Sequence, residues 1–161
     1  MKEPISVGLG EMVVSQEVDD ILVAYGLGSC LGIKMYDPVV RLSGLLHAVL
    51  PTCNIATETG NPKYVDSGIE GLLSAMIKKG ADRRRLVIKM AGGANMLSTP
   101  GFQRTFDIGM RNVESAHKTF ERLNLCLKKE DVGGNIGRTV RVYVCNGRMT
   151  VRIIGGKEQD L

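Results

Sequence analysis

One cysteine of the chain lies among very small residues. The sequence GLGSCLG at residues 26–32 places Cys30 directly after Ser29, with glycines at 26, 28 and 32. Small neighbours let a substrate carbonyl group approach the sulfur, and backbone N–H groups near a turn can hold the oxyanion that forms there. The stretch therefore predicts a nucleophilic cysteine, with Gly28 and Ser29 at an oxyanion-binding turn.

A nucleophilic cysteine needs a base, and His47 is the candidate. It interrupts the apolar run 42–50, where a buried imidazole requires a hydrogen-bond partner. A core histidine with a structural partner is the alternative interpretation. Cys30 on a neighbouring strand favours a Cys–His pair, which can generate thiolate and later protonate a leaving amine. The second histidine, His117, lies in a charged helical segment and is expected to be exposed.

Two familiar motifs fit residues 26–32 poorly. A dinucleotide fingerprint needs a third glycine where Leu31 stands, and a helix after it. The spacing around Cys30 matches a nucleophile elbow, but an elbow leads from a strand into a helix. Residues 33–36 predict a strand instead. Ser29 is an alternative nucleophile without a second base to support it.

Composition predicts a single domain over residues 1–161. Hydrophobic residues make up 43% of the chain and charged residues 24%, which suits a globular core with a solvated surface. The net charge of +4 permits an acidic partner without requiring one. The densest basic cluster has no interleaved aromatic residues, so we expect a helix end and its loop rather than a nucleic-acid site. The cluster comprises Lys78, Lys79, Arg83, Arg84 and Arg85.

The cysteine pattern and the apolar runs exclude several classes. The four cysteines are widely spread without a C-x-x-C pair, which indicates neither a zinc site nor a disulfide framework. Cys126 and Cys145 fall in or beside predicted strands and have a structural interpretation, and Cys53 is ambiguous. No run suits a signal peptide or a transmembrane helix. We therefore expect a cytoplasmic protein with reduced thiols, no metal, no cofactor and no membrane insertion.

The hydrophobic periodicity predicts an α+β fold. Helices are expected over 65–79 and 108–123, with the apolar residues 69, 72, 73, 76 and 77 on one face of the first. Strands are expected over 21–25, 31–36, 42–50, 85–90, 125–129, 140–144 and 149–154. Strands at both ends and helices between them predict a layered α/β sandwich of mostly antiparallel strands, rather than a doubly wound parallel sheet.

Two glycine turns punctuate the second half of the chain. The glycines at 92–93 and 133–134 either shape the rim of the site or form tight turns that require positive φ, and neither interpretation excludes the other. Four polar residues in or near these segments either hydrogen-bond one another structurally, which we favour, or contact the backbone of a substrate. These residues are Arg111, Asn112, Asn135 and Arg138.

Six motifs occur together and in order along nearly the whole chain. They are GLGSC at 26–30, GLLHAVLP at 44–51, KYVD at 63–66, AGGANM at 91–96, IGMRN at 108–112 and DVGGNIGR at 131–138. In these motifs the chain resembles the CheD family of chemoreceptor glutamine deamidases. The resemblance implies a fold similar to the catalytic domain of cytotoxic necrotizing factor. It also implies a cysteine-dependent protein-glutamine glutaminase, an amidohydrolase of chemotaxis that converts glutamines on the cytoplasmic helices of methyl-accepting chemoreceptors to glutamate.

The resemblance assigns roles to individual residues and to partners. Cys30 matches the family nucleophile and His47 the base, but the family threonine six residues before the cysteine is replaced by Ala24. A CheC-type CheY-phosphate phosphatase is the implied protein partner. A weakly catalytic module that regulates such a phosphatase is the alternative function, and a nucleic-acid binder is a third hypothesis. Either a backbone carbonyl or another side chain must orient His47 if the enzyme is active.

Overall fold

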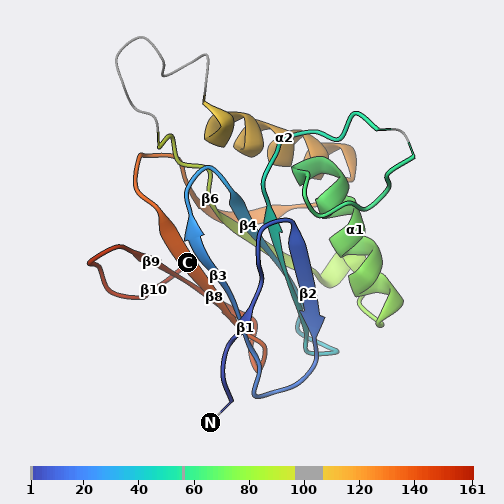
Figure 1. Ribbon diagram of the computed structural model, residues 1–161. Helices are drawn as coiled ribbons and strands as arrows, with labels where there is room; N and C mark the ends of the chain where they lie inside the picture. Colours follow the sequence, from blue (N-terminus) through green and yellow to red (C-terminus); the bar gives the residue numbers. More distant parts are fainter. Residues whose placement is uncertain (1, 56, 97–106) are drawn as a thin grey trace.

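The computed structural model describes residues 2–55, 57–96 and 107–161, which form two sheets and two α-helices (Figure 1). In chain order the elements are β1 (Ile5–Ser6), β2 (Glu11–Ser15), β3 (Ile21–Leu27), β4 (Leu31–Asp37), β5 (Leu42–Ala48), α1 (Val65–Lys78), a 3-10 turn (Arg83–Arg85), β6 (Val87–Gly92), α2 (Ile108–Arg122), β7 (Leu127–Val132), β8 (Arg138–Tyr143), β9 (Arg148–Ile153) and β10 (Gln159–Asp160).

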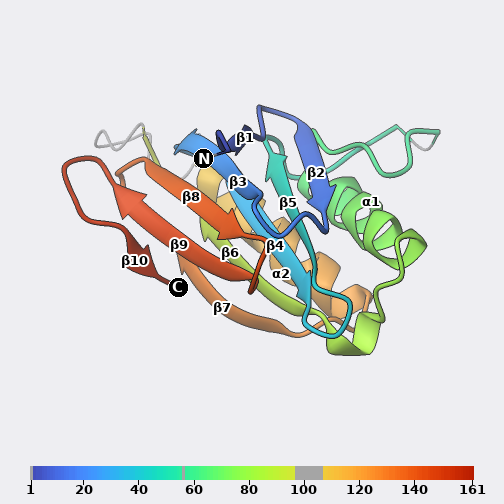
Figure 2. The ribbon, with the colours of Figure 1, turned by 90° about the horizontal axis from the view of Figure 1, so that it is seen from below.

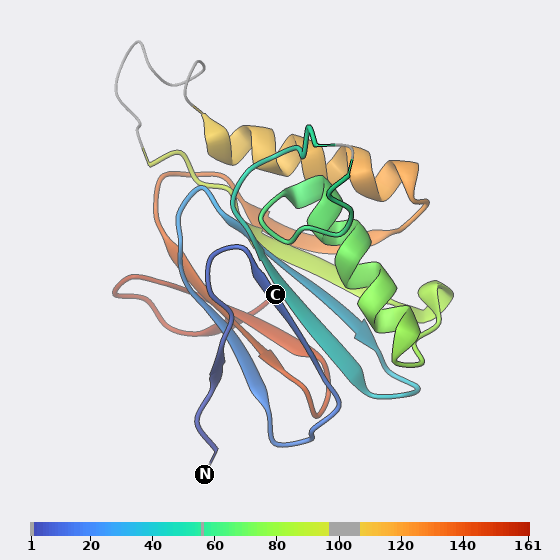
Figure 3. The ribbon, with the colours of Figure 1, turned by 45° about the vertical axis from the view of Figure 1, so that its right-hand side comes forward.

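The elements stack as sheet, sheet and helices. The first sheet has the strand order β1-β3-β8-β9-β10, and the second has the order β2-β5-β4-β6-β7. Figures 2 and 3 show the first sheet packed against one face of the second, while α1 and α2 cover the other face. This arrangement confirms the predicted α+β sandwich, with β1–β3 and β6–β7 as the parallel pairs among the described strands.

Apolar side chains fill both spaces between the layers. One core lies between the helices and the second sheet and includes Leu46, Leu72 and Phe120. The other lies between the two sheets and includes Leu45 and Val140. The strands β4 and β5 are buried along their whole length because they face both cores. Their side chains alternate between the two cores, and this alternation decides which residues can meet between the sheets.

Several expectations need correction. The short strands β1, β2 and β10 carry too few alternating residues to stand out and were not predicted. The predicted strand 85–90 begins later, at Val87, because residues 83–85 form a 3-10 turn. Ile77 is 46% exposed rather than on the buried face of α1. Cys126 and Cys145 are exposed and lie outside the strands.

The sequence predicts a looser segment at 97–107, between the expected strand and the second helix, and its positions 97–106 lie outside the described residues. Asp107 caps the N-terminus of α2, where its carboxylate accepts a hydrogen bond from the backbone N–H of Met110 at 2.9 Å. In the part of the chain that the structure describes, neither helix is long and apolar enough to cross a membrane.

Candidate active site

Cys30 occupies the bend between β3 and β4, directly before Leu31. It is only 8% exposed and belongs to the core between the two sheets. This burial raises the pKa of the thiol, and its own backbone N–H lowers it by less. The resting side chain is therefore a neutral thiol, and a nearby base must remove the proton before the sulfur can attack.

The glycines around Cys30 make room for the protein's own atoms. A side chain at Gly28 would meet Met96, and one at Gly32 would meet Leu27 and Val140, each at 3.0 Å. The space beside Gly28 and Gly32 is therefore filled by packing, whereas a side chain at Gly26 would meet nothing within 4 Å.

His47 lies in β5 on the face that points toward the first sheet. The register pairs it with Gly32 of β4, and Cys30 comes two residues before that glycine. Cys30 belongs to the core between the two sheets, and His47 points into the space between the same sheets, so both residues lie on the same side of the second sheet. Gly32, directly opposite His47, has no side chain to stand between them.

The two ring nitrogens of His47 have different surroundings. Nδ1 lies 2.9 Å from the backbone carbonyl oxygen of Val7. A carbonyl only accepts hydrogen bonds, so Nδ1 carries the proton and the neutral ring has its lone pair on Nε2. Nε2 is buried and has no hydrogen-bond partner among the described residues. Because the side chain is only 3% exposed, this lone pair faces the protein interior.

The carbonyl of Val7 is itself held in place. The N–H of Val7 donates to the carbonyl of Val23 at 2.7 Å, which continues the pairing of β1 with β3. Ala24, the next residue of β3, is fully buried in the same core and presents only a methyl group. A main-chain carbonyl therefore orients His47 here. Sequence reasoning missed Val7 because a backbone acceptor has no residue signature.

Asn112 of α2 fastens the bend that carries Cys30. Its Nδ2 donates to the carbonyl oxygens of Ser29 at 2.8 Å and Val49 at 3.0 Å, and so joins the cysteine bend to the end of β5. The side chain is fully buried, and Oδ1 has no partner in the described part of the structure. The structural role expected for Asn112 is confirmed, and it acts directly on the candidate oxyanion turn.

The glycine turn after β6 packs against the other side of the bend. The N–H of Gly93 donates to the carbonyl of Cys30, and the N–H of Ala94 donates to that of Gly28, both at 2.9 Å. Gly92 has φ of 119°, and a side chain there would lie 2.2 Å from the Cys30 carbonyl oxygen. The turn thus requires glycine and also borders the site, so the two interpretations of this motif hold together.

In the described structure the backbone N–H groups of Ser29 and Cys30 donate to no other residue, and that of Cys30 interacts with its own sulfur. Both are candidate oxyanion donors beside the sulfur. The described residues contain no group of three or more histidine, cysteine, aspartate or glutamate side chains that could hold a metal ion. His117 is half-exposed and pairs with Glu130 at 2.8 Å, as expected for a surface histidine.

The fold and this site define an α+β sandwich with a buried thiol and a buried imidazole on one face between its sheets. The family model for CheD chemotactic sensory transduction matches residues 49–153. The chain therefore belongs to the CheD family, as its motifs indicated.

Individual relatives cover nearly the whole chain. A "Probable chemoreceptor glutamine deamidase CheD" of Symbiobacterium thermophilum is 42% identical over 158 residues, which is 97% of this chain and 96% of the relative. Proteins with the same description from Caldanaerobacter subterraneus subsp. tengcongensis and Pyrococcus abyssi are 40% and 41% identical. They cover 94% and 98% of this chain, and 93% and 96% of their own lengths.

Proposed function

We propose that this chain deamidates glutamine side chains of chemoreceptors, with Cys30 as the nucleophile and His47 as the base. The names of its relatives support the reaction and the substrate. The observation that carries the mechanism is the state of His47, whose Nδ1 is bonded to Val7 while Nε2 has no partner on the face shared with Cys30. A buried lone pair without a donor is costly for a purely structural histidine.

The first half-reaction forms a thioester. Nε2 of His47 accepts the thiol proton, and the Cys30 thiolate attacks the carboxamide carbon of the glutamine. The carbonyl oxygen takes up the electron pair and becomes an oxyanion. When the pair returns, the C–N bond breaks and His47 gives its proton to the nitrogen, so ammonia leaves.

The second half-reaction restores the enzyme. A water molecule gives a proton to Nε2 and attacks the thioester carbon, and the C–S bond breaks with return of that proton to the sulfur. The sum is glutamine plus water to glutamate plus ammonia. The N–H groups of Ser29 and Cys30 are the proposed oxyanion donors in both halves, because both lie beside the sulfur and neither donates to another residue in the described structure.

We also propose that the chain works in the cytoplasm with a CheC-type phosphatase as partner. Four free cysteines agree with a reducing compartment. The alternative, a weakly catalytic regulator of that phosphatase, is favoured by one observation. Cys30 is only 8% exposed, so the thiol reaches a substrate only after part of its surroundings moves.

Mass spectrometry of a chemoreceptor cytoplasmic fragment tests the proposal. We expect glutamine-to-glutamate conversion by the wild type, none by Cys30→Ala, and a rate lower by about 10²–10⁴ for His47→Gln. Matched controls are Cys126→Ala and His117→Gln, which change an exposed cysteine and an exposed histidine and should keep the wild-type rate.

Two outcomes contradict the proposal. Full turnover by Cys30→Ala excludes the thioester mechanism. Absence of conversion by the wild type, together with binding of a CheC-type phosphatase and a change in its rate, supports the regulatory alternative.

A further inference from the structure

A pocket of about 320 Å³ lies on the outer face of the first sheet, beside the strand that leads to Cys30. Four of its lining residues carry charge or an aromatic ring, and we call this group the arginine pocket. It consists of Tyr25, Arg138, Arg141 and Arg152. The sequence motifs gave no role to three of these residues.

A β-bulge builds one wall of the arginine pocket. The pairing of β3 with β8 shifts register between Ala24 and Leu27, and Gly26 in the shift has φ of 61°. Bulges of this kind bend a strand and redirect a side chain, often next to an active site. Tyr25 is consequently 51% exposed, and the guanidinium of Arg141 lies 6.0 Å from the centre of its ring.

The pocket gathers positive charge that the described residues leave unbalanced. Arg141 and Arg152 have no carboxylate partner in the described part of the chain, and Arg152 donates only to the backbone carbonyl of Gly156 at 3.1 Å. Arg138 is 9% exposed and shares the inner face of β8 with Val140; its guanidinium donates to Gly92 and pairs with Asp131, so it adds no free charge to the pocket. The two guanidinium groups of Arg141 and Arg152 beside one hollow favour an anionic ligand.

The nearby carboxylates are paired with groups other than Arg141 and Arg152. Asp131 is 3.4 Å from Nη2 of Arg138 and lies outside the pocket lining. Glu158 accepts a hydrogen bond from the Tyr143 hydroxyl, and Asp160 pairs with Arg148. None of the residues that line the pocket is acidic.

The arginine pocket is physically linked to the cysteine bend. Leu27 pairs with Arg138 across the two strands, and Nη1 of Arg138 donates to the Gly92 carbonyl at 3.2 Å. Gly92 in turn packs against the carbonyl of Cys30. Gly26 lines the pocket four residues before Cys30, so their Cα atoms are at most about 14 Å apart. A helix spans that distance in fewer than about three turns.

The rim of the pocket is apolar. Ile154 is 87% exposed and Ile153 is 43% exposed, and both line the hollow. Large apolar side chains beside arginine and tyrosine are typical of surfaces that contact a protein partner. An amphipathic polypeptide segment with an acidic residue matches this combination. A nucleic acid matches it less well, because its phosphates need a longer basic track and more aromatic platforms.

We infer that the arginine pocket binds a glutamate or aspartate side chain of the substrate polypeptide, located within about three helical turns of the glutamine that reaches Cys30. Ile153 and Ile154 contact the apolar face of the same segment. The pocket thereby selects which glutamines are presented to the sulfur. This inference rests on the proposed deamidase function and adds a determinant of specificity to it.

Steady-state deamidation of a chemoreceptor fragment tests the inference with the double variant R141Q/R152Q. We expect KM to rise roughly tenfold, as for loss of a charge-assisted hydrogen bond, while kcat stays within about twofold. The control is R148Q, which removes a positive charge from the same strand outside the pocket and should keep the wild-type KM. Thermal melts verify that all variants are folded.

The substrate supplies the second half of a double-mutant cycle. Acidic residues within three turns of the target glutamine are changed singly to glutamine or asparagine. One of these changes should raise KM for the wild type and have no further effect on R141Q/R152Q. An unchanged KM for R141Q/R152Q, or an equal rise for R148Q, overturns the inference.

A binding measurement separates this inference from the proposed function. If the wild type shows no conversion, fluorescence anisotropy with the receptor fragment still reports on the pocket. Weaker binding of the fragment by R141Q/R152Q, but not by R148Q, supports the pocket although the deamidase proposal has failed. Unchanged fragment binding overturns it, as does an affinity loss confined to a single-stranded oligonucleotide probe.

Discussion

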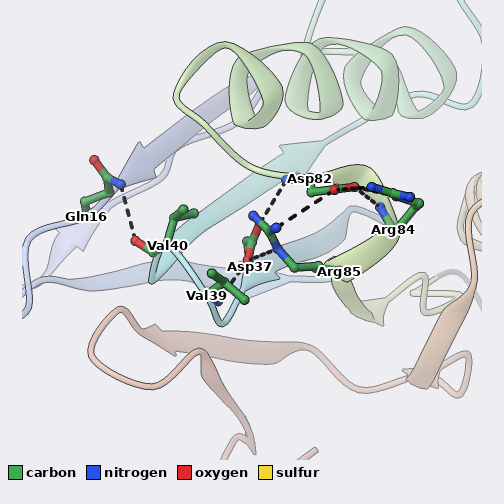
Figure 4. Close-up of polar contacts among 7 residues, drawn as sticks. All are labelled: Gln16, Asp37, Val39, Val40, Asp82, Arg84 and Arg85. Carbon is green, nitrogen blue, oxygen red and sulfur yellow. Dashed lines mark hydrogen bonds and ion pairs between the residues drawn. The ribbon is translucent and has the colours of Figure 1, made fainter.

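Buried polar groups near the two ends of β4 differ in how completely they are hydrogen-bonded. At the C-terminal end of β4, the fully buried carboxylate of Asp37 accepts hydrogen bonds from Arg85 Nη2 at 2.9 Å and Nε at 3.0 Å (Figure 4). The N–H groups of Val39 and Asp82 donate to the same carboxylate at 2.9 and 2.8 Å. Every side of this group is satisfied. Part of the basic cluster seen in the sequence therefore serves the fold, and Arg84 likewise pairs with Asp82.

Around the N-terminal end of β4, beside Cys30, several buried polar atoms have no hydrogen-bond partner. Within the described residues four buried side-chain polar atoms lack a partner. Nε2 of His47, Oδ1 of Asn112 and Nε of Arg138 belong to residues around the cysteine bend, whereas Oγ of Ser43 lies opposite Tyr36, toward the Asp37 end. Buried polar atoms usually find a hydrogen bond, so three of the four exceptions around one bend mark a place where ligand or chemistry is expected. The buried carboxylate at one end of β4 is thus fully paired, whereas most of the unpaired polar atoms gather around the other end.

Protonation follows the same division. Burial raises the pKa of the Asp37 carboxyl, but the bonds from Arg85 and from the two backbone N–H groups outweigh it and hold that pKa below its usual value. Burial also raises the pKa of the Cys30 thiol, and its own backbone N–H offsets this by less. A buried group at one end is kept charged by its neighbours. At the other end it stays neutral until a base acts.

The largest effect expected on stability comes from Asp37→Ala. It leaves two backbone N–H groups and the partly exposed Arg85 without their acceptor, and should lower the free energy of unfolding by about 3 kcal/mol. Deamidation by the folded protein should be nearly unchanged. Cys30→Ala should abolish deamidation and change the free energy of unfolding much less than Asp37→Ala does. Urea denaturation measures the stability of both variants, and the glutamine assay measures their deamidation rates.

Asp19→Ala is the control for Asp37→Ala, because it removes an exposed carboxylate and should shift the urea midpoint little. A stability loss for Asp37→Ala no larger than that of Asp19→Ala contradicts the comparison. So does a loss of deamidation rate in Asp37→Ala at temperatures where the variant is folded.

Lys34 lies between these two ends and is an intermediate case. It is 1% exposed, and its Nζ donates to the carbonyl of Gly147 at 3.1 Å without an acidic partner in the described structure. Burial, assisted by the charges of Lys89 and Lys128, lowers the pKa of Lys34 to about 7. The charged ammonium form of Lys34 is thus destabilised, and the neutral amine is favoured above neutral pH.

The pH dependence of stability tests this state of Lys34. Between about pH 7 and 10.5 the unfolded chain keeps a proton on Lys34 that the folded protein has lost. Stability from this group therefore rises with pH in that window, by up to about 1.4 kcal/mol per pH unit. Lys34→Met should abolish the rise, and urea denaturation at several pH values measures the difference. The raised pKa of Cys30 acts in both proteins and cancels. Parallel curves for the two proteins contradict the assignment.

The sequence predicted the elements that carry strong periodicity and missed those defined by the backbone. The two helices and the strands that bring Cys30 and His47 onto neighbouring chains follow from their apolar patterns. Strand β1 has only two residues, so nothing in its pattern reveals that Val7 will present a carbonyl to His47. That acceptor depends on the parallel pairing of β1 with β3, which is a property of the tertiary fold.

Side-chain partners that are far apart in the sequence could not be predicted either. Arg85 and Asp37 are 48 residues apart, and the basic run around Arg85 gave no sign of which residue it would meet. The arginine pocket arises because a bulge turns Tyr25 outward beside β8 and β9. Residue types identified the candidate nucleophile and base, but the groups that contact these two residues depend on strand register.

The smallest expected effect concerns Ala24, where the family threonine is absent. Ala24→Thr adds a hydroxyl and extra volume in a fully buried site, which should cost about 1–2 kcal/mol of stability. Val142→Thr is the control, because it buries a hydroxyl in the same core. Since Nδ1 of His47 is already bonded to Val7, the deamidation rate of Ala24→Thr should stay within about threefold of the wild type. A tenfold or larger gain that Val142→Thr lacks would show that the carbonyl orients the imidazole incompletely, and the free Nε2 would then reflect a loosely held ring.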